Sequence, residues 1–299
     1  MLENLQGFHI ETTNICTLKC PKCARTKFIE KFPKQWKNKN LDLDNLKAFL
    51  DISLENKIFK LCGNYGDPIY YDRLFELVNW IKKSSGKISI HTNGSYQSRS
   101  WWKDLVSNLD RNDSIFFGID GLPDNFINYR INANWESILI GIEETVSKVK
   151  TIWQYIPFSY NIKHIDEAKE LSIKLGFDDF FVLYSSRWNS LNDPYLPTQN
   201  LFNYKESIVK FNYNKNVIEE IKPKCKINND EHFITADGFY LPCCYVGNHD
   251  FFYKSEFSKN KYDISKFTLS EILYSLNEFY SNLEVNKPIY CKYNCPHYE

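Results

Sequence analysis

Residues 7–25 read GFHIETTNICTLKCPKCAR, in which a short apolar strand, Gly7–Thr12, leads directly into a loop with three cysteines. Cys16, Cys20 and Cys23 follow a CxxxCxxC spacing. Thiolates select zinc, copper(I) or iron–sulfur clusters. A structural zinc site needs four ligands, whereas three thiolates on a cubane leave one iron open to a further ligand. The alternatives are a zinc ion with a distant fourth ligand and three loop cysteines without a shared role.

Beyond this loop, the first two thirds of the chain alternate short apolar runs with longer amphipathic segments. Parallel strands need helix-sized connections, so the alternation predicts an α/β fold with a parallel sheet, open or closed into a barrel. The predicted strands are Gly7–Thr12, Lys57–Cys62, Lys87–His91, Ser114–Ile119, Ile152–Tyr160 and Phe180–Tyr184. The predicted helices are Leu43–Leu54, Tyr71–Lys83, Ser100–Leu109, Trp135–Val149 and Ile165–Leu175.

Changes in composition divide the chain into three segments. The alternating pattern fills residues 1–186, a connecting segment rich in Asn, Tyr, Pro and Lys covers 187–224, and a small cysteine-bearing unit covers 225–299. A turn signal at residues 236–238 predicts a hairpin in the last segment, followed by one helix. Its predicted elements are the strands His232–Thr235 and Phe239–Pro242 and the helix Leu269–Leu283.

Composition excludes some classes of function. Lys+Arg and Asp+Glu are 37 each, and this zero net charge argues against sequence-independent nucleic-acid binding. The chain has no apolar run near the ~18–20 residues of a membrane span, and its start, MLENLQGFHIETTN, does not resemble a signal peptide. We therefore expect a cytoplasmic protein without a membrane partner. In such a reducing compartment, nine cysteines indicate metal or redox work rather than disulfides.

The segment Ile10–Arg25 resembles the cluster loop of radical S-adenosylmethionine (SAM) enzymes. The resemblance implies a partial (β/α)6 TIM-type barrel, a [4Fe–4S] cluster on Cys16, Cys20 and Cys23, and SAM chelated at the open iron. It also implies that a flavodoxin- or ferredoxin-type protein supplies the electron that cleaves SAM, and that a 5′-deoxyadenosyl radical abstracts hydrogen from the substrate. One position departs from the family, because Lys22 stands where an aromatic residue is usual.

Further segments resemble the SAM-binding positions of this superfamily. Tyr65-Gly66-Asp67-Pro68 is similar to a Gly-Gly-Glu-Pro segment that meets the SAM amino group, with Asp in place of Glu and Tyr in place of the first Gly. Thr92-Asn93-Gly94 is similar to a strand end near the ribose. Arg130 resembles an arginine aimed at the SAM carboxylate, and a solvated surface arginine is the alternative.

Asp120 is the candidate catalytic residue. It lies in Gly118-Ile119-Asp120-Gly121, at the end of the fourth predicted strand, where we expect it over the barrel mouth. An ionised carboxylate there could accept hydrogen bonds from SAM or substrate. The alternative is a turn residue that binds backbone N–H groups. Relatives often carry Ser at the Gly118 position, so we expect one side-chain contact to be missing.

The C-terminal cysteines form a second group. Four thiolates at Cys225, Cys243, Cys291 and Cys295 could close around zinc or a fully ligated iron–sulfur cluster. Their arrangement resembles the Twitch domain, a shortened SPASM domain, which implies an auxiliary [4Fe–4S] cluster on these four residues. Structural cysteines in a small core are the alternative. Cys244 is left out of the set, because its side chain should point away from that of Cys243 if the strand continues.

The leading hypothesis is a radical SAM enzyme that acts on a peptide or a small polar metabolite. Because the barrel begins at about residue 7, we expect no extra N-terminal domain for binding a leader peptide. The first alternative is a Twitch-type dehydrogenase of a sugar-like alcohol. The second is a non-catalytic zinc-binding protein with both cysteine groups closed around zinc. An RNA-modifying enzyme would need a basic face, which zero net charge disfavours.

Overall fold

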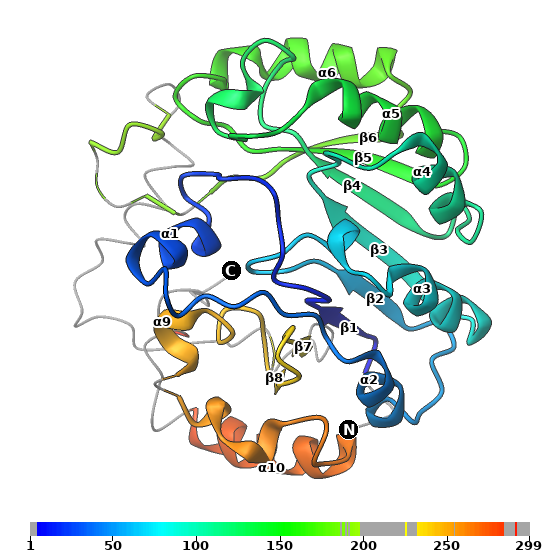
Figure 1. The fold of residues 1–299 in the computed structure, drawn as a ribbon, viewed down its shortest axis with the longest axis vertical. Coiled ribbons are helices and arrows are strands. Elements are labelled where there is room, and N and C mark those ends of the chain that lie inside the picture. The colour runs from blue at the N-terminus through cyan, green and yellow to red at the C-terminus, as the bar shows by residue number, and fades with distance from the viewer. Residues whose placement is uncertain are drawn as a thin grey trace. The chain divides into compact units, whose positions relative to one another are not determined.

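The computed structural model describes residues 5–185, 187–188, 190, 192–197, 225, 232–253, 255–283 and 291. Its first two thirds alternate strands and helices (Figure 1). The strands are β1 (Gly7–Ile10), β2 (Ile58–Leu61), β3 (Lys87–Thr92), β4 (Ser114–Gly118), β5 (Lys150–Tyr155) and β6 (Asp179–Val182). The helices are α1 (Ala24–Lys31), α2 (Leu43–Phe49), α3 (Leu74–Lys83), α4 (Arg99–Val106), α5 (Trp135–Thr145) and α6 (Ile165–Lys174). The predicted α/β class is confirmed.

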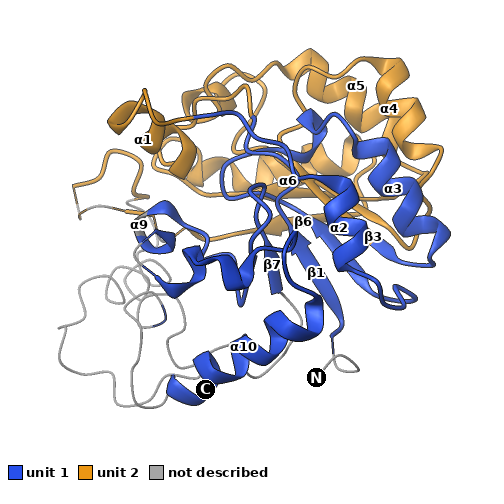
Figure 2. Cartoon of the chain, turned by 60° about the horizontal axis from the view of Figure 1, so that its bottom comes forward, with its two compact units in different colours: residues 1–15, 37–87, 213–299 blue, residues 16–36, 88–212 orange. Residues whose placement is uncertain are grey.

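The chain divides into two compact units, coloured separately in Figure 2. Unit 1 comprises residues 1–15, 37–87 and 213–299, and unit 2 comprises residues 16–36 and 88–212. The expected domain limits at residues 186 and 224 stay a prediction. Among the described residues, no helix is long and apolar enough to cross a membrane.

In unit 1 the strand order is β2-β1-β7-β8, where β7 is His232–Ile234 and β8 is Tyr240–Leu241. β1 runs parallel to β2 and to β7, and β7 and β8 form an antiparallel hairpin. This hairpin was predicted from its turn signal and is confirmed. The same unit contains α9 (His249–Phe252) and α10 (Leu269–Asn282). Thr268 and Glu271 form a capping box at the start of α10.

In unit 2 the order is β3-β4-β5-β6, all parallel, with only Lys87 of β3 outside the unit. The strands bury alternate side chains, as the period of two requires. Helices α4 and α5 begin at side-chain caps, Ser98 and Asn134, which accept hydrogen bonds from backbone N–H groups of the first turn. The starts of these two helices thus have local sequence causes.

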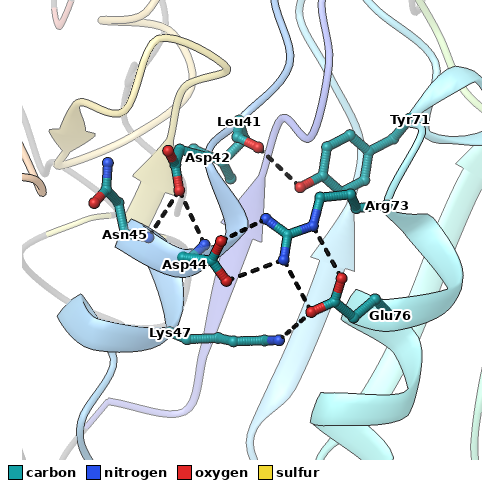
Figure 3. Close-up of polar contacts among 8 residues, drawn as sticks. All are labelled: Leu41, Asp42, Asp44, Asn45, Lys47, Tyr71, Arg73 and Glu76. Atoms are coloured by element: carbon teal, nitrogen blue, oxygen red, sulfur yellow. Dashed lines mark hydrogen bonds and ion pairs between the residues drawn. The ribbon is translucent and has the colours of Figure 1, made fainter.

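Helices α2 and α3 are joined by polar contacts in unit 1 (Figure 3). Arg73 donates to both carboxylate oxygens of Asp44 at 2.9 and 3.0 Å, and to Glu76 on its own helix. Lys47 donates to the same Glu76 carboxylate at 2.6 Å. The buried Tyr71 hydroxyl donates to the Leu41 carbonyl oxygen at 2.8 Å.

Two predicted boundaries were wrong, and one helix was missed, each for a physical reason. The helix expected at Leu43–Leu54 ends at Phe49, and the prediction was too long because Leu50 and Leu54 continue the apolar pattern while they are buried from the loop that follows. The strand expected at Ile152–Tyr160 ends at Tyr155, since the Ile156 N–H donates to the Asp120 carboxylate. Helix α1 was not predicted because it buries Thr26 alone and has no apolar periodicity.

Candidate active site

The cysteine loop, residues 16–23, has its backbone shape fixed at both ends. The Cys23 N–H donates to the Cys20 carbonyl oxygen at 3.0 Å, closing a turn, and Cys23 is then the N-cap of α1. Further back, the Lys19 N–H donates to the Ile131 carbonyl oxygen at 3.0 Å. The Asn132 side-chain amide donates to the Thr17 carbonyl oxygen at 3.4 Å. These contacts hold the loop within unit 2.

All three cysteines of the loop lie at one buried group of apolar side chains in unit 2. Cys20 is a member of this group, and the half-buried Cys16 and Cys23 pack against it. The Tyr129 and Phe158 rings stack in it with centroids 4.0 Å apart. We call this group the loop core, and its buried members are Leu18, Cys20, Tyr129, Phe158, Trp188 and Leu196.

The thiols of the loop suit an iron–sulfur cluster. Burial raises the pKa of Cys20 to about 11, with Arg130 nearby opposing the shift, so a metal would have to displace its proton. The Asn93 side-chain amide donates to the Cys16 sulfur at 3.7 Å. Among the described residues, no three His, Cys, Asp or Glu side chains are already gathered as around a metal ion. Three thiols on one short loop beside an apolar core still match the sulfur preference of the cluster.

Two further predicted residues, Asp120 and Arg130, form an ion pair in unit 2. The Arg130 Nε–H donates to Asp120 Oδ2 at 2.6 Å, and the Ile156 N–H donates to Asp120 Oδ1 at 2.9 Å. Asp120 is fully buried, and burial raises its pKa although Arg130 opposes the shift. Both carboxylate oxygens thus have protein donors. Direct contact of either residue with SAM or substrate stays a prediction.

Gly118, at the end of β4, makes room for the Arg130 guanidinium. A Cβ atom added at residue 118 would lie 2.9 Å from Arg130 Nη2. The missing side chain therefore has a structural consequence, because its space is taken by the end of the arginine side chain.

The predicted SAM-binding segment Tyr65–Pro68 lies in unit 1, directly against the chain that follows β1. A Cβ atom on Gly66 would lie 1.8 Å from the Thr13 carbonyl oxygen, so only glycine fits there. The Asp67 carboxylate caps a 3-10 helix, Pro68–Tyr70, by accepting from the Ile69 N–H at 3.2 Å. The backbone of this segment is thus held by its own unit.

Glu11, which the sequence analysis did not single out, organises that segment. Glu11 is 3% exposed, and its carboxylate accepts from the Tyr65 N–H at 2.7 Å. Burial raises the pKa of Glu11 to about 7. The hydrogen bonds that its carboxylate accepts from the Tyr65, Gly66 and Ala236 N–H groups oppose this rise. An acidic residue placed within a buried strand end was the sequence signal for this role.

Three of the four predicted C-terminal ligands lie near one tyrosine in unit 1. Burial raises the pKa of Tyr280, on α10, and the thiols of Cys225, Cys243 and Cys291 raise it further. Burial also raises the pKa of Cys243. Cys295 lies outside the described residues. Tyr280 was missed because nothing in an amphipathic helix marks a tyrosine as a neighbour of distant cysteines.

We compared the chain with models of protein families and with curated protein sequences. Residues 10–172 match the family model of the Radical SAM superfamily. No curated protein sequence matches the chain.

Solved structures resemble the chain over nearly its whole length. SuiB from Streptococcus suis, bound to S-adenosylmethionine, has a TM-score of 0.61 and 14% identity, covering 96% of this chain and 67% of SuiB. Native anSMEcpe with bound AdoMet has a TM-score of 0.61 and 16% identity, covering 89% and 80%. The same protein with AdoMet and the Cp18Cys peptide gives a TM-score of 0.58 and 16% identity, covering 97% and 85%. These likenesses show that the chain shares the fold of these proteins. The likeness extends past the barrel, as expected from the resemblance of the C-terminal segment to a Twitch domain.

Proposed function

The chain belongs to the radical SAM superfamily, and on that basis we propose that it abstracts hydrogen from a peptide substrate after reductive cleavage of SAM. The observation that carries the proposal is the cysteine loop, which places three thiols beside one apolar core. When bound, the cluster supplies the electron that breaks a carbon–sulfur bond of SAM, giving methionine and the 5′-deoxyadenosyl radical that takes a hydrogen atom from the substrate.

The chain's own residues would bind and orient these groups. Cys16, Cys20 and Cys23 would hold the cluster, and the Asn93 amide would stabilise negative charge on the Cys16 sulfur. The loop core would keep water away from the cluster. Arg130, oriented by Asp120, would bind the SAM carboxylate.

The segment Tyr65–Pro68 and the C-terminal cysteines would take the two remaining roles, binding the SAM amino group and holding a second cluster. Glu11 holds the backbone of Tyr65-Gly66-Asp67-Pro68, where the amino group of SAM would bind. Cys225, Cys243, Cys291 and Cys295 would hold an auxiliary [4Fe–4S] cluster. The support is that Cys225, Cys243 and Cys291 each help to raise the pKa of the same residue, Tyr280. A flavodoxin- or ferredoxin-type protein of the cytoplasm would supply electrons. The peptide complex of anSMEcpe supports a peptide as substrate.

The test is 5′-deoxyadenosine formation by the reconstituted protein under anaerobic conditions. Reduced with dithionite and given SAM, the protein should form 5′-deoxyadenosine and methionine slowly without substrate. Cys20→Ala should abolish the product, whereas Cys62→Ala, which changes a cysteine outside both groups, should retain it. A protein with an intact N-terminal cluster that forms no 5′-deoxyadenosine would refute the proposal.

The peptide assignment needs a separate measurement. Synthetic peptides from short reading frames beside the gene should raise the rate of 5′-deoxyadenosine formation and change mass in the reaction. Stimulation by a polyol or amino sugar, with none by these peptides, would make the substrate a metabolite instead.

A further inference from the structure

Lys22, between two cysteines of the loop, takes part in a buried ion pair. Its Nζ atom lies 2.5 Å from Asp193 Oδ2, and the two side chains are 9% and 1% exposed. The same ammonium lies 5.7 Å from the centre of the Tyr195 ring. Removing two charges from water costs free energy that their attraction only partly offsets, so such a pair is weak evidence for a stabilising role. Its place within the cysteine loop suggests a role at that loop.

Asp193 belongs to a turn that is also fixed to the loop core. Its Oδ1 atom accepts from the Tyr195 N–H at 3.1 Å, and its carbonyl oxygen accepts from the Leu196 N–H at 3.0 Å. Ser159 binds the turn twice, donating from its N–H to the Tyr195 carbonyl oxygen and from its hydroxyl to that of Pro194. Leu196 is a member of the loop core. We call residues 193–197 the Asp193 turn.

The ion pair therefore joins the cysteine loop to a turn 171 residues away in sequence. It also brings one positive and one negative charge into a buried region beside Cys20 and Cys23. Charges interact strongly where water is excluded, because the effective dielectric constant is low. The reduction potential of an iron–sulfur cluster responds to nearby charge and to solvent exposure.

We propose that Lys22 and Asp193 are paired positioning residues that pin the Asp193 turn to the cysteine loop and balance the charge beside the cluster. This inference rests on the proposed function, since it needs a cluster on that loop. The ammonium alone would favour the reduced, more negative cluster, and the carboxylate alone would favour the oxidised one. In the ion pair, the effects of the two charges on the reduction potential nearly cancel.

The deciding experiment is the midpoint potential of the cluster whose EPR spectrum changes when SAM is added. In the anaerobic holoprotein, Asp193→Asn should raise this potential, because Lys22 loses its counter-charge while the amide oxygen can still accept from Tyr195. Lys22→Met should lower it. The double variant should return close to the wild-type potential, and replacing both charges of a buried pair usually preserves folding.

An exposed ion pair of the same unit provides the control. Arg99 and Glu143 pair at 2.6 Å with side chains 46% and 57% exposed, so Glu143→Gln should leave the potential unchanged. Shifts of the two single variants in the same direction, or no shift in either at full iron content, would overturn the charge-balancing role.

The pinning role has its own readout, which needs no activity. Amide hydrogen exchange within residues 193–197 should become faster in both single variants and in the double variant, but not in Glu143→Gln. Unchanged exchange would overturn the pinning role. Wild-type iron content and 5′-deoxyadenosine formation are measured first, so a failure of the proposed function is seen in the wild-type protein before any variant is compared.

Discussion

At the scale of single residues, Asp120 and Arg130 illustrate how a buried charge depends on its partner. Asp120→Asn keeps the size of the side chain but leaves the Arg130 guanidinium, whose side chain is only 17% exposed, without its counter-charge. We expect the free energy of unfolding to fall by about 3 kcal/mol. Anaerobic denaturant titration of the variant and of Asp120→Asn/Arg130→Gln checks this, and the double variant should recover part of the loss.

The opposite result would give Asp120 a different role. If stability stays at the wild-type value while 5′-deoxyadenosine formation per cluster falls more than about tenfold, or ~1.4 kcal/mol, Asp120 acts at the SAM site, by direct contact or through Arg130. The two measurements together therefore separate a role in folding from a role at the SAM site.

Residues marked by short motifs could be found from the sequence, and residues marked by distant partners could not. The cysteine spacing identified the loop that the structure packs around one core. Asp193 binds Lys22 across 171 residues, and Glu11 binds Tyr65 across 54, so both needed the fold. The Asp193 turn also lay in a segment whose composition indicated only a connection.

At the scale of elements, amphipathic helices and alternating strands were predictable, while the contacts that fasten them were not. Tyr71→Phe removes the hydroxyl that binds the Leu41 carbonyl oxygen near α2 (Figure 3). Because that oxygen is left buried without its donor, we expect a loss of about 1 kcal/mol in the free energy of unfolding. Thermal or denaturant unfolding measures it, and the loss should not depend on salt.

The exposed charges of the same contact region provide the contrast. Arg73→Gln removes the ion pairs with Asp44 and Glu76. Solvent screens such pairs, so the loss of stability should be smaller than for Tyr71→Phe and should shrink in high salt. A salt-independent loss larger than that of Tyr71→Phe would contradict this ranking.

Strands β1 and β7 carry two buried histidines that should make the protein sensitive to acid. Burial, aided by Lys60, lowers the pKa of His9 to about 3, and burial lowers that of His232 to about 4. From pH 6.5 downward these two histidines bind protons in the unfolded chain but stay neutral in the folded chain, so the free energy of unfolding falls. Each histidine accounts for roughly 2 kcal/mol of this loss at pH 5.

His9→Gln tests this dependence. The glutamine amide can still donate to the Cys62 carbonyl oxygen, which His9 Nε2 binds at 2.7 Å, but it does not titrate. Between pH 7 and 5 the free energy of unfolding should fall less steeply in the variant than in the wild type, with cluster content matched. Parallel pH profiles would show that His9 is protonated in the folded state as readily as in the unfolded chain.

At the scale of the whole molecule, each compact unit carries one cysteine group. The cysteine loop belongs to unit 2, and the described C-terminal cysteines belong to unit 1. We therefore expect about eight irons per chain after anaerobic reconstitution, four for each cluster.

Changing Cys16, Cys20 and Cys23 together to Ala should leave about four irons per chain, because the ligands of the second group are separate. Cys62→Ala should retain about eight as the matched control. Retention of about eight irons in the triple variant would disprove the ligand assignment of the loop, whereas loss of all iron would mean that unit 1 holds its cluster only when unit 2 holds its own.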